Sequence, residues 1–510
     1  MDKNGAKMSE YNIRNLLNAG APDAIAITAP ERPALTYKAL EEHIDSIAAQ
    51  LASKGLTNSD RVAIVLPNGP EMATAFLAVS SYMSAAPLNP SYKQAEYEFY
   101  LEDLNPKLVI IEQGSTNPVR EAALKLSIPI AEINIKENAA AGAFNLFETT
   151  QTIELPSAST EALVLHTSGT TSRPKVVPLT QANLVASASN IASTLKLSDV
   201  DHSLNIMPLF HIHGLIAVLC ASISAGASVC CTAGFNALKF FDLAAGEKIT
   251  WFSGVPTMHQ AILLRGQRQA QTAKALNLRF IRSSSASLPP AVFDELTELF
   301  NSPVIEAYGM TEATHQMTSN PLPPHVQKAG FVGLPAGPEV CIMDASGNQV
   351  AKGEEGEVCI KGENVTPGYD KNPDANAQSF INGWFRTGDQ GMFDADGYLK
   401  ITGRLKEIIN RGGEKISPLE IDNVLMEHPA IQQVVSFAVA DKSYGEEIGV
   451  AIVLGEGQSL TEAELKNYAN ERLARFKIPK YIRFLDEIPK GATGKMQRIG
   501  LAKKLGLEGD

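Results

Sequence analysis

Basic residues are scarce in this 510-residue sequence, in which 44 lysines and arginines stand against 56 aspartates and glutamates, for a formal net charge of −12. The sequence contains no cluster of basic residues, so it lacks the basic segment typical of nucleic-acid-binding proteins. Apolar residues make up 44% and charged residues 20% of the chain, which excludes collagenous and disordered proteins. At ~150 residues per domain we expect about three domains, with two or four also allowed.

Cysteine is also scarce, and the sequence contains no Cys-x-x-Cys pair. The odd number of cysteines predicts reduced thiols in a reducing compartment rather than a disulfide framework. These residues are Cys220, Cys230, Cys231, Cys341 and Cys359. The first 11 residues carry mixed charge and no apolar stretch, so we expect no signal peptide and a cytoplasmic location.

Long hydrophobic runs are missing apart from one uncharged segment, residues 214–238. Small and polar residues dilute this segment, and Gly226 interrupts it. The pattern therefore predicts a buried helix followed by a buried strand, and no membrane span.

Short apolar runs alternate with helical patterns over most of the chain. Residues 62–66 are typical of a buried strand, and the spacing over 71–83 predicts a helix after a turn. Further strands are expected at 108–111, 162–165, 228–231, 249–252, 279–281 and 304–305. This alternation predicts an α/β fold with parallel-rich sheets covered by helices. Ligands of such sheets bind beyond the carboxyl ends of the strands, so we expect the site in the loops that follow them.

The pattern changes near residue 355. Residues 356–362 and 393–404 favour antiparallel strands, and Asp396-Gly397 is a hairpin turn signal between two of them. Further along, a helix is predicted over 461–476, with a capping-box spacing at its first residues.

This change divides the predicted fold in two. We predict a large N-terminal domain, residues 1–403, and a small α+β C-terminal lobe, residues 404–510. The polar residues 404–407 are the expected hinge that joins them.

The segment 163–175, LVLHTSGTTSRPK, is the most informative part of the sequence. A buried strand runs into small hydroxyl residues, a glycine and a lysine, which let N–H and O–H groups converge on phosphate oxygens. It differs from the loop of kinases and ATPases, because Pro174 precedes the lysine. The predicted phosphate ligands are Thr167, Ser168, Gly169, Thr170, Thr171 and Lys175.

This loop resembles the phosphate loop of the acyl-adenylating superfamily, which includes acyl-CoA synthetases, peptide-synthetase adenylation domains and luciferases. Four further motifs follow in the family's order: EAYGMTEAT at 306–314, TGD at 387–389, GRLKEIINRGGEKISP at 403–418 and PKGATGKMQR at 489–498. Ser172 and Val176 stand where the family's loop has glycine, and the first should make the loop less flexible. The stretches TSRPK, RSSSASL and EATHQMTSNPLP are similar to the oxalate–CoA ligase branch.

The resemblance implies that the chain activates a carboxylic acid with ATP as an acyl-adenylate and then transfers the acyl group to coenzyme A. It implies that Tyr308 stacks on adenine and that Asp389 accepts hydrogen bonds from the ribose. The further ATP-binding residues implied are Ala286, Glu306, Ala307, Gly309, Met310 and Arg404.

Catalysis is expected to depend on Lys495, Thr311 and Glu312. When a carboxylate attacks the α-phosphorus of ATP, two anions approach each other. The enzyme is therefore expected to accelerate this step mainly by positioning the reactants and neutralising their charge. Lys495 lies on a loop rich in Gly and Thr, from which it can reach the reacting anions, and Glu312 beside a hydroxyl suits Mg²⁺. Lys406 matches the family's hinge position, about which the small lobe would turn to let CoA enter near residues 411–413.

The acid pocket is expected to contain His211, Ser285 and His315, together with Lys495. These are polar donors where a fatty-acid enzyme would need an apolar tunnel, and they suit a second carboxylate. With the resemblance, they favour oxalate as the substrate. The alternative is that they are structural and the acid is a monocarboxylate.

Other functions stay open at this point. The chain could be a medium-chain or aromatic acyl-CoA ligase, or an adenylation enzyme that loads a separate carrier protein. A nucleotide-binding regulator without catalysis is disfavoured, because Lys495, Glu312 and Asp389 are all present. The expected partners are therefore a small carboxylate, ATP and CoA, and the oligomeric state is left open.

Overall fold

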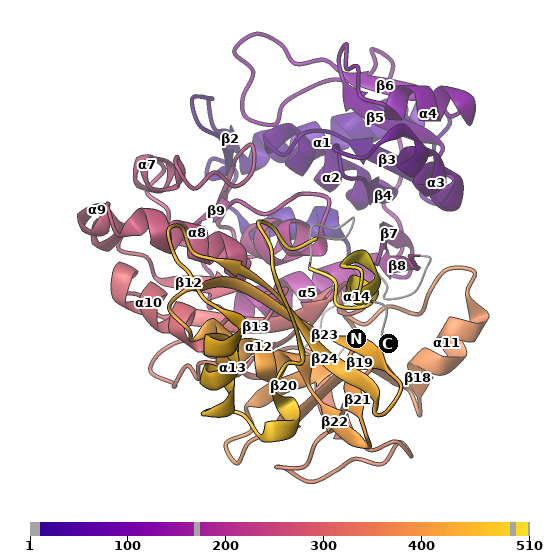
Figure 1. Ribbon diagram of the computed structural model, residues 1–510. Coiled ribbons are helices and arrows are strands. Elements are labelled where there is room, and N and C mark those ends of the chain that lie inside the picture. Colours follow the sequence, from indigo (N-terminus) through magenta and orange to yellow (C-terminus); the bar gives the residue numbers. More distant parts are fainter. Residues whose placement is uncertain (1–10, 168–173, 490–495, 508–510) are drawn as a thin grey trace. The chain divides into compact units, whose positions relative to one another are not determined.

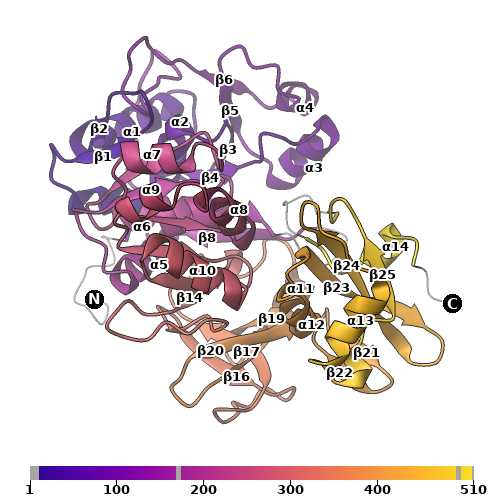
Figure 2. The ribbon, with the colours of Figure 1, turned by 60° about the vertical axis from the view of Figure 1, so that its left-hand side comes forward.

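The computed structural model describes residues 11–167, 174–489 and 496–507. The chain splits into two compact units, which are described one at a time (Figures 1 and 2). Unit 1 comprises Met1–Thr167, Lys175–Glu339 and Lys361–Gln378. Unit 2 comprises Ser168–Pro174, Val340–Ile360 and Ser379–Asp510.

The first sheet of unit 1 has six strands. They are β3 (Arg61–Val65), β4 (Ser84–Pro87), β5 (Leu108–Glu112), β6 (Ile130–Ile133), β7 (Glu161–His166) and β8 (Val176–Thr180). Their order is β6-β5-β3-β4-β7-β8, and neighbours run parallel except β7 and β8.

The N-terminal part of unit 1 also contains helices. They are η2 (Ile13–Ala19), α1 (Tyr37–Ala52), α2 (Pro70–Tyr82), α3 (Gln94–Leu104) and α4 (Val119–Lys125). Helices α3 and α4 pack on one face of the strands through Tyr97, Leu101 and Ala122. Helix α2 packs against α1 and against strands β3, β4 and β7.

The second sheet of unit 1 has nine strands. They are β1 (Ile25–Thr28), β2 (Leu35–Thr36), β9 (His202–Asn205), β10 (Ser228–Cys231), β11 (Trp251–Gly254), β12 (Phe280–Ser283), β13 (Val304–Met310), β14 (His315–Ser319) and β15 (Leu334–Pro335). The order is β15-β14-β13-β12-β11-β9-β10-β1-β2. The strands from β1 to β13 along this order are parallel, whereas β2, β14 and β15 are antiparallel to their neighbours.

The remaining helices of unit 1 are α5 (Gln181–Thr194), the π-helix η3 (His213–Cys220), α6 (Ala221–Ile223), α7 (Phe240–Gly246), α8 (Pro256–Gly266), α9 (Ala270–Ala275), α10 (Pro290–Phe300), the 3₁₀ turn η4 (Thr311–Ala313) and α11 (Pro373–Ser379).

The two faces of the nine-stranded sheet carry different kinds of side chain. Helices α7 to α10 form an apolar core with Phe252, Ile281 and Val304. Because side chains alternate along a strand, Ser253 and Arg282 point to the opposite face, where η3 lies.

Unit 2 contains two smaller sheets. The first consists of β16 (Glu339–Met343), β17 (Gly356–Lys361), β18 (Phe380–Ile381), β19 (Trp384–Phe393) and β20 (Leu399–Arg404). Its order is β16-β17-β19-β18, and β20 pairs with β19. The antiparallel pairing of β17, β19 and β20 confirms the strands expected after residue 355.

The second sheet of unit 2 consists of β21 (Ile409–Arg411), β22 (Glu414–Ile416), β23 (Ile431–Asp441), β24 (Gly445–Leu454) and β25 (Tyr481–Phe484). The accompanying helices are α12 (Pro418–Met426), α13 (Glu462–Asn470), the 3₁₀ turn η5 (Arg475–Lys477) and α14 (Leu501–Lys504). Helices α12 and α13 pack on one face through Ile421, Leu425 and Leu465. Leu501 of α14 packs with Phe437 in a separate cluster.

The expected α/β class is confirmed, and the uncharged segment 214–238 forms a buried helix followed by strand β10. Two predicted extents are wrong. The helix expected over 461–476 ends at Asn470, because the backbone becomes extended at Ala474 and brings Phe476 back onto the cluster of buried side chains. The strand expected at 304–305 continues to Met310, because it pairs there with β14.

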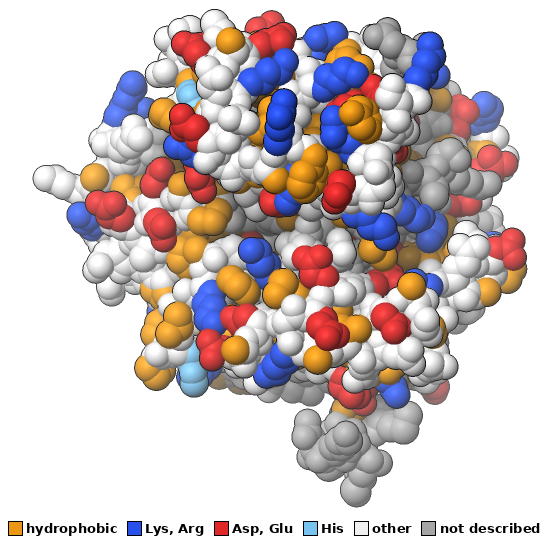
Figure 3. Space-filling model, turned by 60° about the horizontal axis from the view of Figure 1, so that its bottom comes forward, with side chains coloured by type: hydrophobic (Ala, Val, Ile, Leu, Met, Phe, Trp, Pro, Cys, Tyr) orange, Lys and Arg blue, Asp and Glu red, His pale blue; other side chains and the backbone are white. Residues whose placement is uncertain are grey.

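Within the described residues, no helix combines the length and apolar character needed to cross a membrane. All five cysteines are free thiols with buried side chains. Figure 3 shows one face of the molecule, on which lysine and arginine side chains are interspersed with aspartate and glutamate side chains. The charge of that face is therefore mixed in sign.

Candidate functional site

The predicted phosphate loop connects two paired strands of unit 1. Strands β7 and β8 are antiparallel, with His166 opposite Val176, and the N–H of Thr167 donates to the carbonyl of Lys175 over 2.9 Å. The two ends of the loop are thus held together. Val176, which stands where the family has glycine, is buried in β8. It is a β-branched residue, a type that is favoured in strands. The predicted ligands Ser168, Gly169, Thr170 and Thr171, and the variant Ser172, lie outside the described residues.

Lys175, the lysine of this loop, and Glu312, the predicted metal ligand, both contact Tyr369. The Lys175 Nζ lies 4.2 Å from the centre of the Tyr369 ring, which is a cation–π contact. The Tyr369 hydroxyl donates to Glu312 Oε1 over 2.9 Å. Tyr369 therefore joins two predicted site residues that are far apart in the sequence. The sequence analysis missed Tyr369, since nothing in its local pattern distinguishes it from a core tyrosine.

The predicted adenine motif forms the end of β13. Tyr308, Gly309 and Met310 are partly exposed, so the Tyr308 ring is accessible to a ligand. A Cβ on Gly309 would lie 1.8 Å from the carbonyl oxygen of His315, so only glycine fits this close approach of two strands. Thr311 and Glu312 follow in η4, and Glu312 is 7% exposed.

The residues after β12 form a loop anchored to β13. The Ser284 hydroxyl donates to the carbonyl of Ala307 over 2.9 Å, and the N–H of Leu288 donates to Glu306 Oε1 over 2.9 Å. Burial raises the pKa of Glu306 to about 8, so that its carboxyl is mostly protonated at neutral pH. Glu306 thus holds the end of the loop through its hydrogen bond with Leu288, whereas Ala286, in the middle of the loop, is exposed.

A histidine that the sequence analysis did not select lies at the centre of the predicted acid pocket. His213 Nδ1 is hydrogen-bonded to Ser285 Oγ at 3.0 Å, and its Nε2 to Ser253 Oγ at 2.7 Å. The His315 ring lies 4.9 Å from the His213 ring, centre to centre. The structure therefore brings Ser285 and His315 together, as predicted, but through His213. We call His213, Ser253, Ser285 and His315 the histidine–serine cluster.

His211, the histidine predicted for this pocket, lies elsewhere on the same turn. It is half-buried, and its ring contacts Phe210 at a centroid distance of 4.5 Å. The two histidines of the His-x-His pair differ because only His213 lies within the buried start of η3. The signal for His213 was present in the sequence, but the spacing did not show which histidine faces Ser285.

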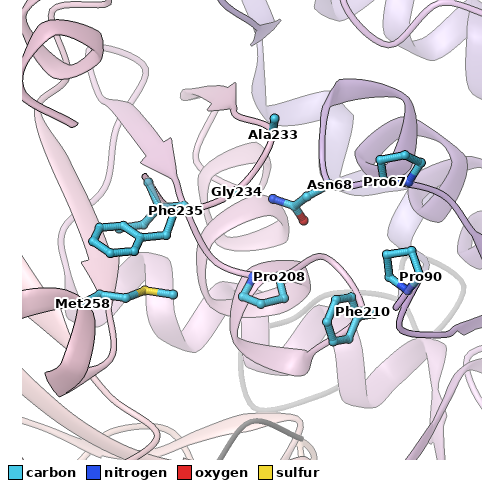
Figure 4. A pocket seen from close by; sticks show the side chains of 10 residues that line it. Pro67, Asn68, Pro90, Pro208, Phe210, Ala233, Gly234, Phe235 and Met258 are labelled. Atoms are coloured by element: carbon cyan, nitrogen blue, oxygen red, sulfur yellow. The ribbon is translucent and has the colours of Figure 1, made fainter. Parts of the chain in front are cut away.

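Phe210 also borders a cavity of about 300 Å³ in unit 1 (Figure 4). Its walls come from loops that follow β3, β4, β9 and β10, together with Met258 of α8. Asn68 donates to the carbonyls of Met207 and Thr232 and so holds two of these loops together. The cavity is mostly apolar and contains no residue of the histidine–serine cluster.

The predicted ribose residues form an ion pair in unit 2. Asp389 and Arg404 are opposite each other on β19 and β20, with Arg404 Nε 3.0 Å from Asp389 Oδ1. Gly388 has a φ of 75° and its N–H donates to Glu357 Oε1, so a residue with a Cβ would be strained there. The turn presents a carboxylate and a guanidinium side by side.

The predicted hinge residue Lys406 is exposed in the turn between β20 and β21. The next residue, Glu407, forms an ion pair with Arg498, whose Nε lies 3.1 Å from the carboxylate. Arg498 also contacts Asp422 at 2.6 Å and donates to the carbonyl of Ser436. Arg498 therefore ties the end of the predicted catalytic-lysine motif to the hinge turn within unit 2. Lys495 itself lies outside the described residues.

The predicted magnesium site has few protein ligands. Glu312 has the Thr311 hydroxyl as its neighbour in the chain. In the described part of the chain, no group of three or more His, Cys, Asp or Glu side chains could hold a metal ion by itself. This sparse donor set fits Mg²⁺, which usually takes most of its oxygen ligands from water and nucleotide phosphates.

The comparisons with known proteins agree with these features. The sequence profile for AMP-binding enzymes matches residues 17–370, and the profile for their C-terminal domain matches residues 420–495. The chain is 45% identical to an oxalate–CoA ligase of Arabidopsis thaliana over 94% of this chain and 95% of that protein. It is 42% identical to an oxalate–CoA ligase of Saccharomyces cerevisiae over 94% of each chain.

Two solved structures share the whole fold. ATP-bound MatB from Rhodopseudomonas palustris is 27% identical and has a TM-score of 0.86, with 98% of each chain covered. The o-succinylbenzoate CoA synthetase of Bacillus subtilis, in complex with ATP and a magnesium ion, is 29% identical with a TM-score of 0.82, covering 96% of this chain and 99% of that one.

The chain belongs to the AMP-binding enzyme family. The predicted membership of the acyl-adenylating superfamily is thereby confirmed, as is the prediction that the chain is an enzyme.

Proposed function

We propose that this enzyme is an ATP-dependent ligase that converts a small dicarboxylate, most simply oxalate, into its CoA thioester. Similarity to two oxalate–CoA ligases over nearly the whole chain supports the proposal. The alternatives are a medium-chain or aromatic acyl-CoA ligase and a carrier-loading enzyme. A relative named for an aromatic acid, the 2-succinylbenzoate–CoA ligase of Bacillus licheniformis, covers as much of the chain but is less similar, at 32% identity.

The reaction has two steps. A carboxylate oxygen of the acid attacks the α-phosphorus of ATP, and the bond to pyrophosphate breaks, which gives an acyl-adenylate. The thiol of CoA, after losing its proton, then attacks the acyl carbon and expels AMP. Both steps bring anions or electron-rich groups together, so the protein mainly positions them and neutralises charge.

In this proposal the phosphates bind at the loop that ends in Lys175, and the adenine binds at the end of β13. Lys175 and the loop ahead of it contact the phosphates, and Tyr369 holds both Lys175 and Glu312 in place. The Tyr308 ring stacks on adenine. A Mg²⁺ ion held by Glu312 would neutralise phosphate charge, as is usual for such ions.

Further residues complete the proposed machinery. Asp389 and Arg404 bind the ribose, and Lys495 approaches the reacting anions in the first step. Lys406 is the hinge between a domain of residues 1–403 and a lobe of residues 404–510. The buried free thiols favour a cytoplasmic enzyme.

The histidine–serine cluster is the observation that carries the choice of a dicarboxylate. His213, Ser253 and His315 are buried in unit 1, and Ser285 lies half-buried beside them. Buried anions need such donors. A fatty acid would leave these polar groups facing an apolar chain. A second carboxylate would instead accept hydrogen bonds from Ser285 and His315.

The test is CoA consumption with ATP and a panel of oxalate, malonate, acetate and octanoate. We expect oxalate to be preferred. His315→Ala should raise the KM for oxalate about ten- to a hundredfold, since a charge-assisted hydrogen bond contributes about 1.5–3 kcal/mol, with the KM for ATP nearly unchanged. The exposed His325 gives the matched control, His325→Ala. A preference for octanoate would refute the dicarboxylate, and a loss of ATP affinity in His315→Ala would move His315 to the nucleotide site.

A further inference from the structure

Arg282 is an unusual residue for the middle of a parallel sheet. It lies on β12 with a relative exposure of 0%, among the largest fully buried side chains. Its Nη2 donates to Gln316 Oε1 over 3.1 Å, whereas its Nε and Nη1 have no hydrogen-bond partner in the structure. A guanidinium has five N–H groups, so most of its donor capacity is unused.

The charge of Arg282 is also uncompensated. Among the described residues, the Arg282 guanidinium forms no ion pair with an aspartate or a glutamate. Burial lowers the pKa of Arg282 to about 9, which still leaves the side chain protonated at neutral pH. A buried charge without a partner is strongly unfavourable, so such a group normally has an anion near it.

The position of Arg282 suggests where that anion binds. On the neighbouring strand β11, Ser253 is its partner in register, and both side chains point to the face of the sheet that η3 covers. Ser253 is hydrogen-bonded to His213 at 2.7 Å. On the other side, the acceptor of Arg282 is Gln316, which directly follows His315 in β14.

One neighbour of Arg282, Ser253, thus belongs to the histidine–serine cluster, and the other, Gln316, follows the cluster residue His315 in the chain. Glu306, the buried carboxyl on the adjacent strand β13, is paired in register with Ser283 and so faces the opposite side of the sheet. It is also mostly protonated, so it does not supply the missing anion. Among the described residues no carboxylate is paired with Arg282, so a bound substrate can supply the anion.

We propose that Arg282 is a positioning residue that selects dianionic acids, because its buried positive charge favours a second carboxylate bound at the histidine–serine cluster. It acts on the substrate through the field of its buried charge, since its one hydrogen bond in the described part of the chain is to Gln316. The inference rests on the proposed function and adds a specificity determinant to it. The substrate class it defines is small acids with a second anionic group, whether carboxylate or sulfonate.

The experiment compares wild type with Arg282→Met, which removes the charge at similar length, and Arg282→Lys, which keeps it. For each enzyme, kcat and KM are measured with oxalate, malonate, acetate and propionate, together with the KM for ATP and the melting temperature. In Arg282→Met we expect the KM for both dicarboxylates to rise about ten- to a hundredfold, while the values for acetate and propionate stay within about twofold. Arg282→Lys should restore most of the preference.

If Arg282→Met does not fold, Gln316→Glu gives the same test, because a carboxylate beside Arg282 cancels its charge without removing it. This variant should also lose the preference for dicarboxylates. The inference would be overturned if the KM for dicarboxylates, divided by the KM for monocarboxylates, were the same in Arg282→Met or Gln316→Glu as in wild type. An equal loss for all four acids and ATP would also overturn it, since that is the result of a purely structural role.

The wild-type panel separates the two proposals. A wild-type enzyme that prefers acetate or propionate contradicts the dicarboxylate function itself, and the role of Arg282 with it. A wild-type enzyme that prefers oxalate, combined with an Arg282→Met enzyme that keeps the preference, contradicts only the role of Arg282.

Discussion

At the scale of single residues, the site depends on contacts between side chains that are remote in the sequence. Tyr369 is the clearest case, since its ring lies under the ammonium of Lys175 and its hydroxyl holds the carboxylate of Glu312. A tyrosine placed in this way fixes the distance between a cation that would meet phosphates and a carboxylate that would meet Mg²⁺. One side chain thus organises two charges of opposite sign.

Tyr369→Phe removes the hydroxyl and keeps the ring. We expect the kcat/KM for ATP in the adenylation step to fall about tenfold, because the hydrogen bond to a charged carboxylate is lost. Tyr369→Leu also removes the cation–π contact, and the loss should be larger. ATP–pyrophosphate exchange measures this step.

Tyr82→Phe is the matched control, because the Tyr82 hydroxyl bonds the carboxylate of Asp45 at 2.8 Å, and neither residue is assigned to the site. It should leave the exchange rate unchanged. An exchange rate in Tyr369→Phe equal to that of wild type would show that the hydroxyl does not support Glu312.

At the scale of secondary-structure elements, most of the proposed site residues lie near the ends of strands. The phosphate loop follows β7, the adenine motif closes β13, and the histidine–serine cluster gathers at β11, β14 and the start of η3. Parallel strands bring their carboxyl ends to one edge of a sheet, so that residues from distant segments converge there. The turn between β20 and β21 has a different role, since it carries the proposed hinge residue Lys406.

Lys406→Pro tests that turn. Proline fixes φ and restricts the preceding residue, so rotation about the turn should be hindered. We expect acyl-adenylate still to form, and CoA thioester formation to fall by at least about a hundredfold, an effect of ~2.7 kcal/mol. The two steps are followed by pyrophosphate exchange and by thioester formation.

Lys406→Ala leaves the backbone free to rotate and serves as the control. It should support both steps. An equal loss in Lys406→Ala and Lys406→Pro would assign the effect to the side chain, and two intact steps in Lys406→Pro would place the hinge elsewhere.

At the scale of the whole molecule, the two units carry different residues of the proposed site. Unit 1 carries Lys175, Glu312, Tyr308 and the histidine–serine cluster, whereas unit 2 carries Asp389, Arg404 and the segment that leads to Arg498. A reaction with two steps needs different groups at the acyl carbon in each step. Lys495 is predicted to serve only the first of them.

Lys495→Ala should reduce adenylation by about 10²–10³, the effect of losing one preorganised charge donor. Thioester formation from presynthesised acyl-adenylate should be much less affected. Lys503→Ala, which removes an exposed lysine of α14, is the control and should leave both steps intact. A similar loss in both half-reactions of Lys495→Ala would contradict the assigned role.

The sequence alone predicted the family and the chemistry, because phosphate recognition by a loop depends on a short contiguous run of small hydroxyl residues. The same holds for the capping box at Thr461 and Glu464, which the structure confirms. It also predicted that His211, Ser285 and His315 lie together, and the structure brings Ser285 and His315 together through His213.

Only the tertiary structure decided which further residues complete the site. Tyr369 lies 57 residues from Glu312, His213 lies 72 residues from Ser285, and Arg282 reaches Gln316 across 34 residues. None of these pairs has a local pattern, since each is brought together by strand order and by the face to which a side chain points. Local motifs therefore indicated the reaction, whereas the packing of the sheets determined which buried side chains meet, because burial and register exist only once the chain has folded.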